Sequence, residues 1–323
     1  MEWEQRSIKL CAGMLLFAVA LRLVAAGGLI PVGQALEDPG AASFLIYLQT
    51  GRIIRQVPET TPLPPTTTAP ETIPVERISF HAEDAALVAL DDTCGRRPDV
   101  AALLTEPLGL ELTGDGPKVL ILHTHTTESF AQTADRYQET SAYRTLDGNH
   151  NMLALGDLVA EKLEAAGICV IHDRTLHDYP SYNGSYSHAA ASTKDYLQQY
   201  PTIALVIDLH RDAADTTGGQ MVTRCTVDGE KAAQLMFVVG TDTRLNHPGW
   251  ERNLSLALKL QVLLEKENPG ICRDMNLTKN RYNQHLGPYA LLVEIGAAGN
   301  TLPQAKLAAR ELAEAIVKLV NGV

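Results

Sequence analysis

Short and long apolar segments alternate along the chain from residue 116 to its end at residue 323. A short, unbroken apolar run predicts a buried strand, and apolar residues three or four positions apart predict one face of a helix. The predicted strands are 119–122, 168–171, 203–209, 235–240 and 290–293, and the predicted helices are 151–166, 187–199, 251–267 and 303–320. Strands that alternate with helices indicate an α/β fold, so we expect a three-layer sandwich with a mainly parallel sheet over residues 116–323.

The first 33 residues have a different character. Arg6 and Lys9 precede an apolar stretch over 10–32, which Arg22 interrupts. The stretch is about long enough to cross a bilayer, and the basic residues before it favour a cytoplasmic amino terminus. We expect residues 1–33 to be an uncleaved, single-pass signal anchor in the cell membrane, with the rest of the chain on the extracytoplasmic side. Small residues at 25–28 leave cleavage as a signal peptide as the alternative.

Residues 34–115 are expected to connect the anchor to the α/β domain. The segment 58–74 is rich in Pro and Thr, a composition that cannot bury a core and stays extended. It predicts a stalk that holds the domain away from the membrane. Residues 75–115 show no clear periodicity and are interpreted either as a small collar or as further linker.

Charge and cysteine content exclude several classes of protein. The formal net charge is −11, which argues against nucleic acid as a partner. The five cysteines are scattered and odd in number, without CxxC spacing. A disulfide framework or a cysteine zinc site is therefore not expected.

Ionisable residues follow three of the predicted strands. The first strand leads into His123, His125 and Glu128. The third contains Asp208 and leads into His210, Arg211 and Asp212, and the fifth leads into Glu294. In an open α/β sheet, ligands bind outside the carboxyl ends of the strands. Segments that are far apart in the sequence are thus expected to bring imidazoles and carboxylates to one edge.

Imidazoles with carboxylates are the composition of a catalytic zinc site, which keeps one coordination position for water. Zinc lowers the pKa of that water, and a nearby carboxylate accepts its proton. Glu294 suits the role of the catalytic base, because a merely structural carboxylate would be costly at the end of an apolar strand. Each residue by itself is better explained by a structural role, and the hypothesis rests on the coincidence of three such strand ends in one domain.

Two polar clusters are candidates for substrate binding. The segment 178–187 contains Tyr182 and Asn183, and the segment 281–286 contains Asn283. Aromatic faces with amide and guanidinium donors suit sugar and peptide recognition, and Arg211 is added to this group. The alternative is a pair of ordinary surface loops rich in turn-forming residues.

Several segments together resemble one known family. HTHTTES, RTLDGNHNMLALGD, DRTLHDYPSYNGSYS, VIDLHRDA, HPGWERNL, RYNQHL and ALLVEIGAAGNTL resemble, in order, stage II sporulation protein P, over roughly residues 117–315. That family is similar, more distantly, to the zinc N-acetylmuramoyl-L-alanine amidases. The resemblance implies a zinc-dependent peptidoglycan hydrolase that cleaves the amide between N-acetylmuramic acid and L-alanine, with endopeptidase activity on cross-linked stem peptides. It further implies action during engulfment in sporulation, with stage II sporulation proteins D and M as partners.

The resemblance also implies roles for particular residues. Glu294 matches the catalytic glutamate of the amidases, and His210 matches their later zinc histidine. Either His123 or His125 matches the first zinc histidine, and either Glu128 or Asp147 stands near the place of the third ligand. The alternatives to an amidase are a stalked, non-catalytic cell-wall binding protein and a zinc peptidase that acts on stem peptides only.

Overall fold

The computed structural model describes residues 78–131, 143–213, 215–216 and 219–322. The expected anchor and the Pro/Thr-rich segment lie outside these residues. Among the helices in the described ranges, none combines the length and the apolar character needed to cross a membrane.

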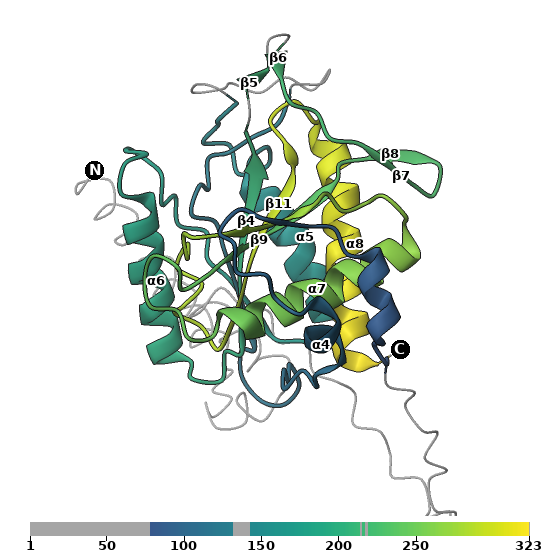
Figure 1. Ribbon diagram of the computed structural model, residues 1–323. Coiled ribbons are helices and arrows are strands. Elements are labelled where there is room, and N and C mark those ends of the chain that lie inside the picture. The colour runs from purple at the N-terminus through teal and green to yellow at the C-terminus, as the bar shows by residue number, and fades with distance from the viewer. Residues whose placement is uncertain (1–77, 132–142, 214, 217–218, 323) are drawn as a thin grey trace, which may run out of the picture. The chain divides into compact units, whose positions relative to one another are not determined.

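A seven-stranded sheet forms the centre of the described chain (Figure 1). Its order is β1 (Leu90–Asp92), β10 (Met275–Thr278), β9 (Leu235–Gly240), β11 (Tyr289–Ala297), β4 (Leu205–Asp212), β2 (Val119–Leu122) and β3 (Val170–His172). Every neighbouring pair is parallel except β9 with β11. The predicted α/β fold with a mainly parallel sheet is therefore confirmed. Two small antiparallel ribbons, β5 (Asp215–Thr216) with β6 (Gly219–Gln220) and β7 (Cys225–Val227) with β8 (Glu230–Ala232), lie outside it.

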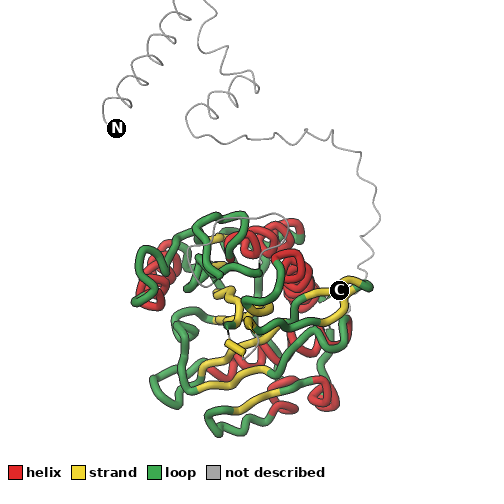
Figure 2. The backbone as a smooth tube through the Cα atoms, turned by 90° about the horizontal axis from the view of Figure 1, so that it is seen from above, coloured by secondary structure: helices red, strands yellow, loops and turns green. Residues whose placement is uncertain are grey.

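Helices cover the two faces of the sheet unequally. One face packs against α5 (Met152–Ala165), α7 (Trp250–Glu267) and α8 (Leu302–Asn321), together with the short α4 (Val100–Thr105) and η1 (Ala82–Leu87). The other face carries α6 (Ser185–Gln199), which packs over β2 and β4 in a smaller apolar cluster. Figure 1 shows the strands between α6 and the larger helical layer, and Figure 2 shows them from above. The result is an asymmetric three-layer sandwich.

Local sequence signals set the helix ends. The Asn151 side chain accepts a hydrogen bond from Leu153 N, which caps α5, and Gly167 follows the helix with φ +83°, a conformation that glycine adopts readily. Helix α8 begins after Thr301, whose side chain and that of Gln304 form a capping box. These helices lie within one residue of the predicted ranges.

Residues 78–115 belong to the folded unit rather than to a linker. Strand β1 is the edge strand of the central sheet, and Leu103 and Leu104 of α4 are buried in the main core. The Lys259 ammonium on α7 donates to the Leu103 carbonyl oxygen at 2.7 Å. The predicted domain boundary at 116 is therefore too late, because a three-residue strand and a six-residue helix are too short to show a periodic pattern.

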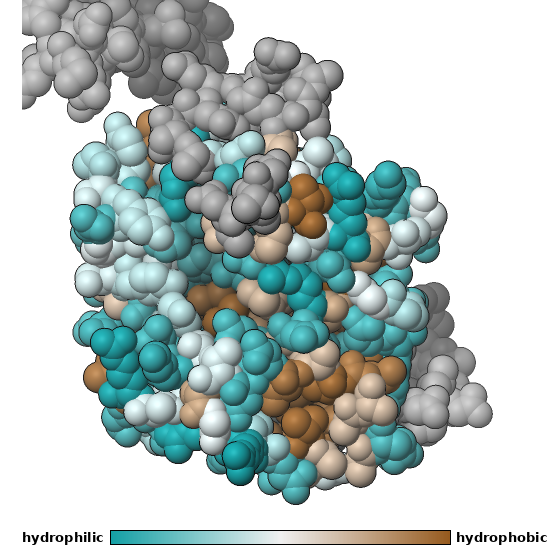
Figure 3. All heavy atoms as spheres, turned by 45° about the horizontal axis from the view of Figure 1, so that its top comes forward, coloured by the Kyte–Doolittle hydropathy of each residue, from teal (hydrophilic) through white to brown (hydrophobic). Residues whose placement is uncertain are grey.

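The described surface is mostly hydrophilic, as the view in Figure 3 shows, with apolar residues gathered in patches. Six large apolar side chains of the described residues are exposed, and Tyr179 and Tyr182 are among them. Both belong to the polar cluster that precedes α6.

Alternation along the strands decides what reaches each face. In β4, Leu205, Ile207 and Leu209 enter the main core, so Asp208 and His210 point to the α6 side. In β11, Leu292 and Glu294 point to that same side, and Glu294 is the register partner of His210. The charged residues thus meet on the less covered face of the sheet.

Candidate active site

A cavity of about 240 Å³ lies on this face, where β4 and β11 end. Its lining comprises His125, Glu128, Tyr186, His210, Arg211, Asp212, Ala213, Met236, Val238, Asn276, Tyr282, Leu292 and Glu294. The structure therefore brings together four of the predicted chemical residues: Glu294, His125, Glu128 and His210. They come from three segments that are far apart in the sequence, as expected for strand ends at one edge.

His210 is held between carboxylates. Its Nε2 lies 3.0 Å from Asp208 Oδ1, without the in-line geometry of a hydrogen bond, and its Nδ1 lies 3.8 Å from Glu128 Oε2. Burial by itself lowers the pKa of His210, but Asp208, Glu294 and Glu128 together raise it to about 10. Asp208 is anchored in turn, since it accepts from Thr124 N at 2.8 Å and from Thr124 Oγ1 at 2.6 Å.

Glu294 carries a buried oxygen without a partner. Within the described part of the chain, its Oε2 accepts no hydrogen bond. Burial raises the pKa of Glu294 to about 8; Glu128 and Asp212 add to the rise, and His210 opposes it. An unsatisfied buried carboxyl oxygen is costly, and in a cavity it indicates a group that interacts with a ligand or substrate.

His125 is surrounded by aromatic and hydroxyl groups. Its ring stacks on Tyr182 with the ring centroids 4.5 Å apart, and it meets the His210 ring edge-on at 5.3 Å. The Tyr182 hydroxyl lies 3.1 Å from Nε2, and Ser185 Oγ lies 3.3 Å from Nδ1. Burial, followed by the charges of His210 and Arg144, lowers the pKa of His125 to about 3, so the neutral imidazole is favoured.

His123 does not line the cavity. Its Nδ1 donates to the Leu209 carbonyl oxygen at 3.1 Å, and its Nε2 lies 2.9 Å from His172 Nε2. Gly156 in the middle of α5 makes room for this pair, because a Cβ at that position would come within 2.3 Å of His172 and 2.6 Å of His123. His123 is therefore directed to the α5 side, and of the two candidate histidines only His125 reaches the site.

Glu128, not Asp147, is the additional carboxylate at the cavity. Glu128 is buried, and its Oε2 accepts from Arg211 N at 3.2 Å. Asp147 instead forms an ion pair with His150 at 2.8 Å and accepts from Asn149, and it does not line the cavity.

The four predicted substrate-binding residues differ in whether they line the cavity and in what they contact. Arg211 lines the cavity, but its guanidinium donates to Ser129 O at 2.9 Å and to Tyr143 O at 3.0 Å. Asn283 donates to Tyr186 O at 2.8 Å and so ties its loop to α6. Tyr182 touches His125, and the exposed Asn183 is outside the cavity lining. Arg211 and Asn283 therefore support the walls of the site.

Tyr186 lies in the predicted substrate-binding segment 178–187, and it lines the cavity. Sequence reasoning gave no role to Met236, Val238 or Asn276, which also line it. Val238 pairs in register with Leu292 and with Asn276, and Met236 pairs with Glu294. Alternation in the predicted strand 235–240 indicates that Met236 and Val238 share a face, but it does not indicate which face carries the site. Asn276 lies on β10, which was too short to be predicted.

The chemistry of the donors suits a metal ion, although their arrangement is not that of a formed metal centre. His125, Glu128 and His210 offer imidazole and carboxylate ligands, and His210 Nε2, like Glu294 Oε2, lacks a hydrogen-bond partner. Over the described ranges, no group of three or more His, Cys, Asp or Glu side chains is already placed to hold a metal ion.

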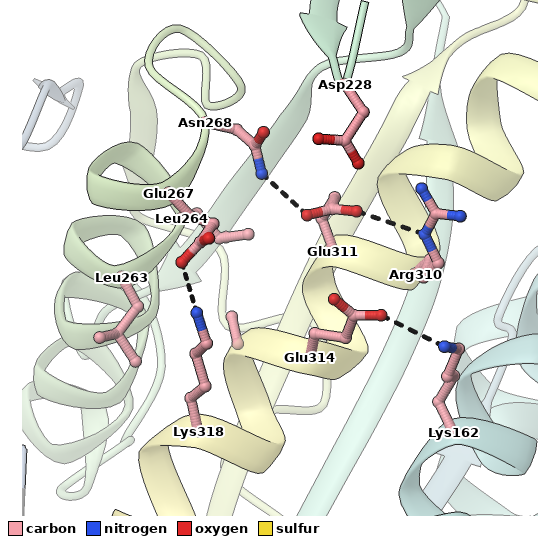
Figure 4. Close-up of a pocket in the computed structure, with 11 residues that line it drawn as sticks. Lys162, Asp228, Leu263, Leu264, Glu267, Asn268, Arg310, Glu311, Glu314 and Lys318 are labelled. Atoms are coloured by element: carbon pink, nitrogen blue, oxygen red, sulfur yellow. Dashed lines mark hydrogen bonds and ion pairs between the residues drawn. The ribbon is translucent and has the colours of Figure 1, made fainter. Parts of the chain in front are cut away.

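A second cavity, of about 340 Å³, lies among α5, α7, α8 and the β7–β8 turn (Figure 4). Six of its charged side chains form three ion pairs: Lys162 with Glu314 at 3.2 Å, Arg310 with Glu311 at 3.3 Å, and Lys318 with Glu267. Asn268 donates to Glu311 at 2.8 Å. These groups stabilise the helical layer, and the reactive residues lie in the smaller cavity.

Comparison with solved structures gives weak likenesses to amidases. N-acetylmuramoyl-L-alanine amidase AmiC2 of Nostoc punctiforme has a TM-score of 0.39 and 15% identity, covering 64% of this chain and 97% of that one. N-acetylmuramoyl-L-alanine amidase from Clostridium difficile 630 has a TM-score of 0.36 and 17% identity, covering 64% and 96%. At these scores the likeness carries no argument about mechanism.

Comparison with protein families gives a firmer result. The model of stage II sporulation protein P matches residues 66–317. Stage II sporulation protein P of Bacillus subtilis (strain 168) is 31% identical over 221 residues, which cover 63% of this chain and 51% of that protein. The match thus spans about half the length of that relative. Because the family model covers most of this chain, the chain belongs to the stage II sporulation protein P family.

Proposed function

We propose that this chain is a peptidoglycan hydrolase that cleaves the amide between the lactyl group of N-acetylmuramic acid and L-alanine. The observation that carries the proposal is the unpartnered, buried Glu294 Oε2 beside His210 in a cavity at the strand ends. Family membership supports peptidoglycan as the substrate.

The proposed cofactor is zinc, held by His125, Glu128 and His210, whose donor atoms suit that ion. A zinc ion bound there would supply an acidified water and would polarise the carbonyl of the amide. The chain's own residues do the rest. In its ionised form, Glu294 accepts a proton at Oε2 from the water that attacks the amide carbonyl and passes it to the leaving nitrogen. Asp208 lies 3.0 Å from His210 Nε2 without the geometry of a hydrogen bond, and the apolar Met236, Val238 and Leu292 limit the water in the cavity.

The setting of the activity is part of the same proposal. Residues 1–33 would anchor the chain in the membrane, so that the folded unit faces the cell wall at the engulfing septum of a sporulating cell. Stage II sporulation proteins D and M are the proposed partners, and cleavage of cross-linked stem peptides is a proposed additional activity. Membership of a sporulation protein family supports the setting, and the apolar stretch over 10–32 supports the anchor.

Product analysis tests the proposal. The full chain is incubated with purified sacculi and zinc, and the released material is examined by mass spectrometry. Stem peptides that begin with L-alanine, together with glycan bearing free lactyl groups, are the expected products. Cleavage only within the stems would instead make the protein a peptidase, and sedimentation with sacculi without any product would make it a cell-wall binding protein.

A further inference from the structure

The segment that carries His125 and Glu128 is held by backbone hydrogen bonds to residues 143–145, one before and one after Glu128. Thr145 N donates to Thr127 O at 2.8 Å, and Ser129 N donates to Tyr143 O at 2.8 Å. Glu128 and Arg144 face each other in an isolated antiparallel bridge. The position of both cavity residues therefore depends on how Thr127 and Arg144 are held.

One buried carboxylate holds both of them. The Asp178 side chain has no exposed surface. It accepts from Thr127 N at 3.1 Å, from Thr127 Oγ1 at 2.7 Å and from Arg144 Nη1 at 2.5 Å. Hydrogen bonds to a buried carboxylate, one of them from a guanidinium, are among the strongest in proteins.

Arg144 carries this contact on to both cavity residues. Its Nη2 lies 3.4 Å from Glu128 Oε1. Its guanidinium lies over the Tyr182 ring, 4.7 Å from the centroid. Tyr182 in turn stacks on His125 and reaches its Nε2 with the hydroxyl. Asp178 is thus one side chain removed from Glu128 and two from His125.

We propose that Asp178 is a positioning residue, which sets the directions of Glu128 and His125 in the cavity through Thr127 and Arg144. The inference rests on the proposed function, because it takes these two residues to serve the reaction. Partners one contact away from metal ligands commonly alter metal affinity by ~10–100-fold when they are replaced. Asp178 lies at that distance from Glu128.

Asp173 provides a matched control. Like Asp178, it is a buried carboxylate between β3 and α6. It accepts hydrogen bonds from the amide and the hydroxyl of one threonine, Thr175 N at 3.0 Å and Thr175 Oγ1 at 2.7 Å. It also pairs with a basic side chain, His177, at 3.0 Å. In the described part of the chain, its partners are these two residues and not Thr127 or Arg144.

The experiment compares the full chain with its Asp178→Asn and Asp173→Asn variants. Melting temperature, zinc affinity by chelator competition, kcat and KM for stem-peptide release, and amide exchange over residues 125–131 are measured on each. Both variants are expected to lose stability. Asp178→Asn is further expected to weaken zinc binding by ~10–100-fold, to lower kcat and to speed exchange in 125–131, whereas Asp173→Asn leaves these three near wild type.

Equal effects of the two variants on zinc affinity and on kcat per folded molecule would reduce Asp178 to a structural residue. Failure of the proposed function looks different, since the unmodified chain itself would then bind no zinc and release no peptide. In that case exchange over 125–131 still decides the positioning role. If residues 125–131 are equally protected from amide exchange in the two variants, the positioning role of Asp178 is refuted.

Discussion

Glu294 and His210 illustrate how much a single register pair can contribute to a site. Each lies on the outward face of a buried strand, and the two are side by side because β4 and β11 are parallel and in register at these positions. Burial favours the neutral form of Glu294, while three carboxylates favour the charged form of His210. The pKa values of both Glu294 and His210 are thus raised, and the two side chains lie next to each other at the edge of the sheet.

The first prediction concerns Glu294→Gln. The amide keeps the size of the side chain and removes its basicity, so turnover is expected to fall by ~10²–10⁴-fold, the usual loss when a general base is removed. Zinc content and melting temperature should stay close to those of the unmodified chain. His210→Ala is the comparison, because it should lose zinc and activity together. Near-normal turnover by a folded, zinc-loaded Glu294→Gln protein would remove this residue from the mechanism.

The second prediction separates His123 from His125. His123→Ala leaves the Leu209 carbonyl and His172 without their buried partner. The free energy of unfolding should therefore fall by ~1–3 kcal/mol, and the melting temperature should fall with it. Zinc affinity per folded molecule should be retained. His125→Ala should show the reverse, with zinc affinity lost and stability little changed. Calorimetry and chelator competition on both variants check this, and loss of zinc by the folded His123→Ala variant would contradict it.

At the scale of elements, the unexpected feature is the docking of the residues before 116 on α7. Lys259 is buried, and its ammonium donates to Leu103 O at 2.7 Å and to Ser255 Oγ at 3.0 Å. The Phe80 ring covers it, with the nitrogen 5.4 Å from the centroid. Helix α4 and the chain before η1 are thus joined to α7 through one lysine. Burial lowers the pKa of that lysine to about 8.

The third prediction follows from this pKa. Below about pH 8 both the folded and the unfolded chain hold the proton of Lys259, and the buried charge costs its full amount. Between about 8 and the ordinary value of 10.5, the unfolded chain binds more protons than the folded one, so the contribution of Lys259 to stability rises with pH. Relative to Lys259→Met, the unmodified chain should gain about 2–3 kcal/mol across this window. Lys231→Met, at an exposed lysine, controls for net charge, and parallel stability curves for the unmodified chain and Lys259→Met would refute the assignment.

The sequence predicts uninterrupted apolar strands and long helices well, and short strands that contain polar residues poorly. Strands 119–122 and 235–240 lie where they were predicted, because each is a complete apolar run. Strands β1 and β10 have three and four residues and contain polar residues, so neither forms a complete apolar run. The site follows the same rule. His210 and Glu294 lie on strands and could be placed from the pattern, whereas the choice between His123 and His125 depends on a turn whose course is set by Asp178, Thr124 and Gly156.

At the scale of the whole molecule, residues 78–115 are an integral part of the folded unit. Strand β1 closes one edge of the sheet against β10, and the two leucines of α4 fill the core beside α7. Removing them would expose an edge strand and apolar surface together.

The fourth prediction is that a chain beginning at residue 116, where the sequence pattern places the domain boundary, does not fold cooperatively. A chain beginning at residue 78 is expected to keep a single, sharp unfolding transition. Circular dichroism during heating and size-exclusion chromatography compare the two. If the shorter chain is monomeric and melts as sharply as the longer one, the described residues before 116 are dispensable.

The antiparallel pairing of β9 with β11 divides the sheet into two blocks that run in opposite senses. Where β4 and β11 end, β9 and β10 begin. His210 and Glu294 therefore precede loops that leave the sheet, whereas Met236 and Asn276 follow loops that enter it. The cavity is therefore lined from two directions of the chain, by residues at the ends of one block of strands and at the starts of the other.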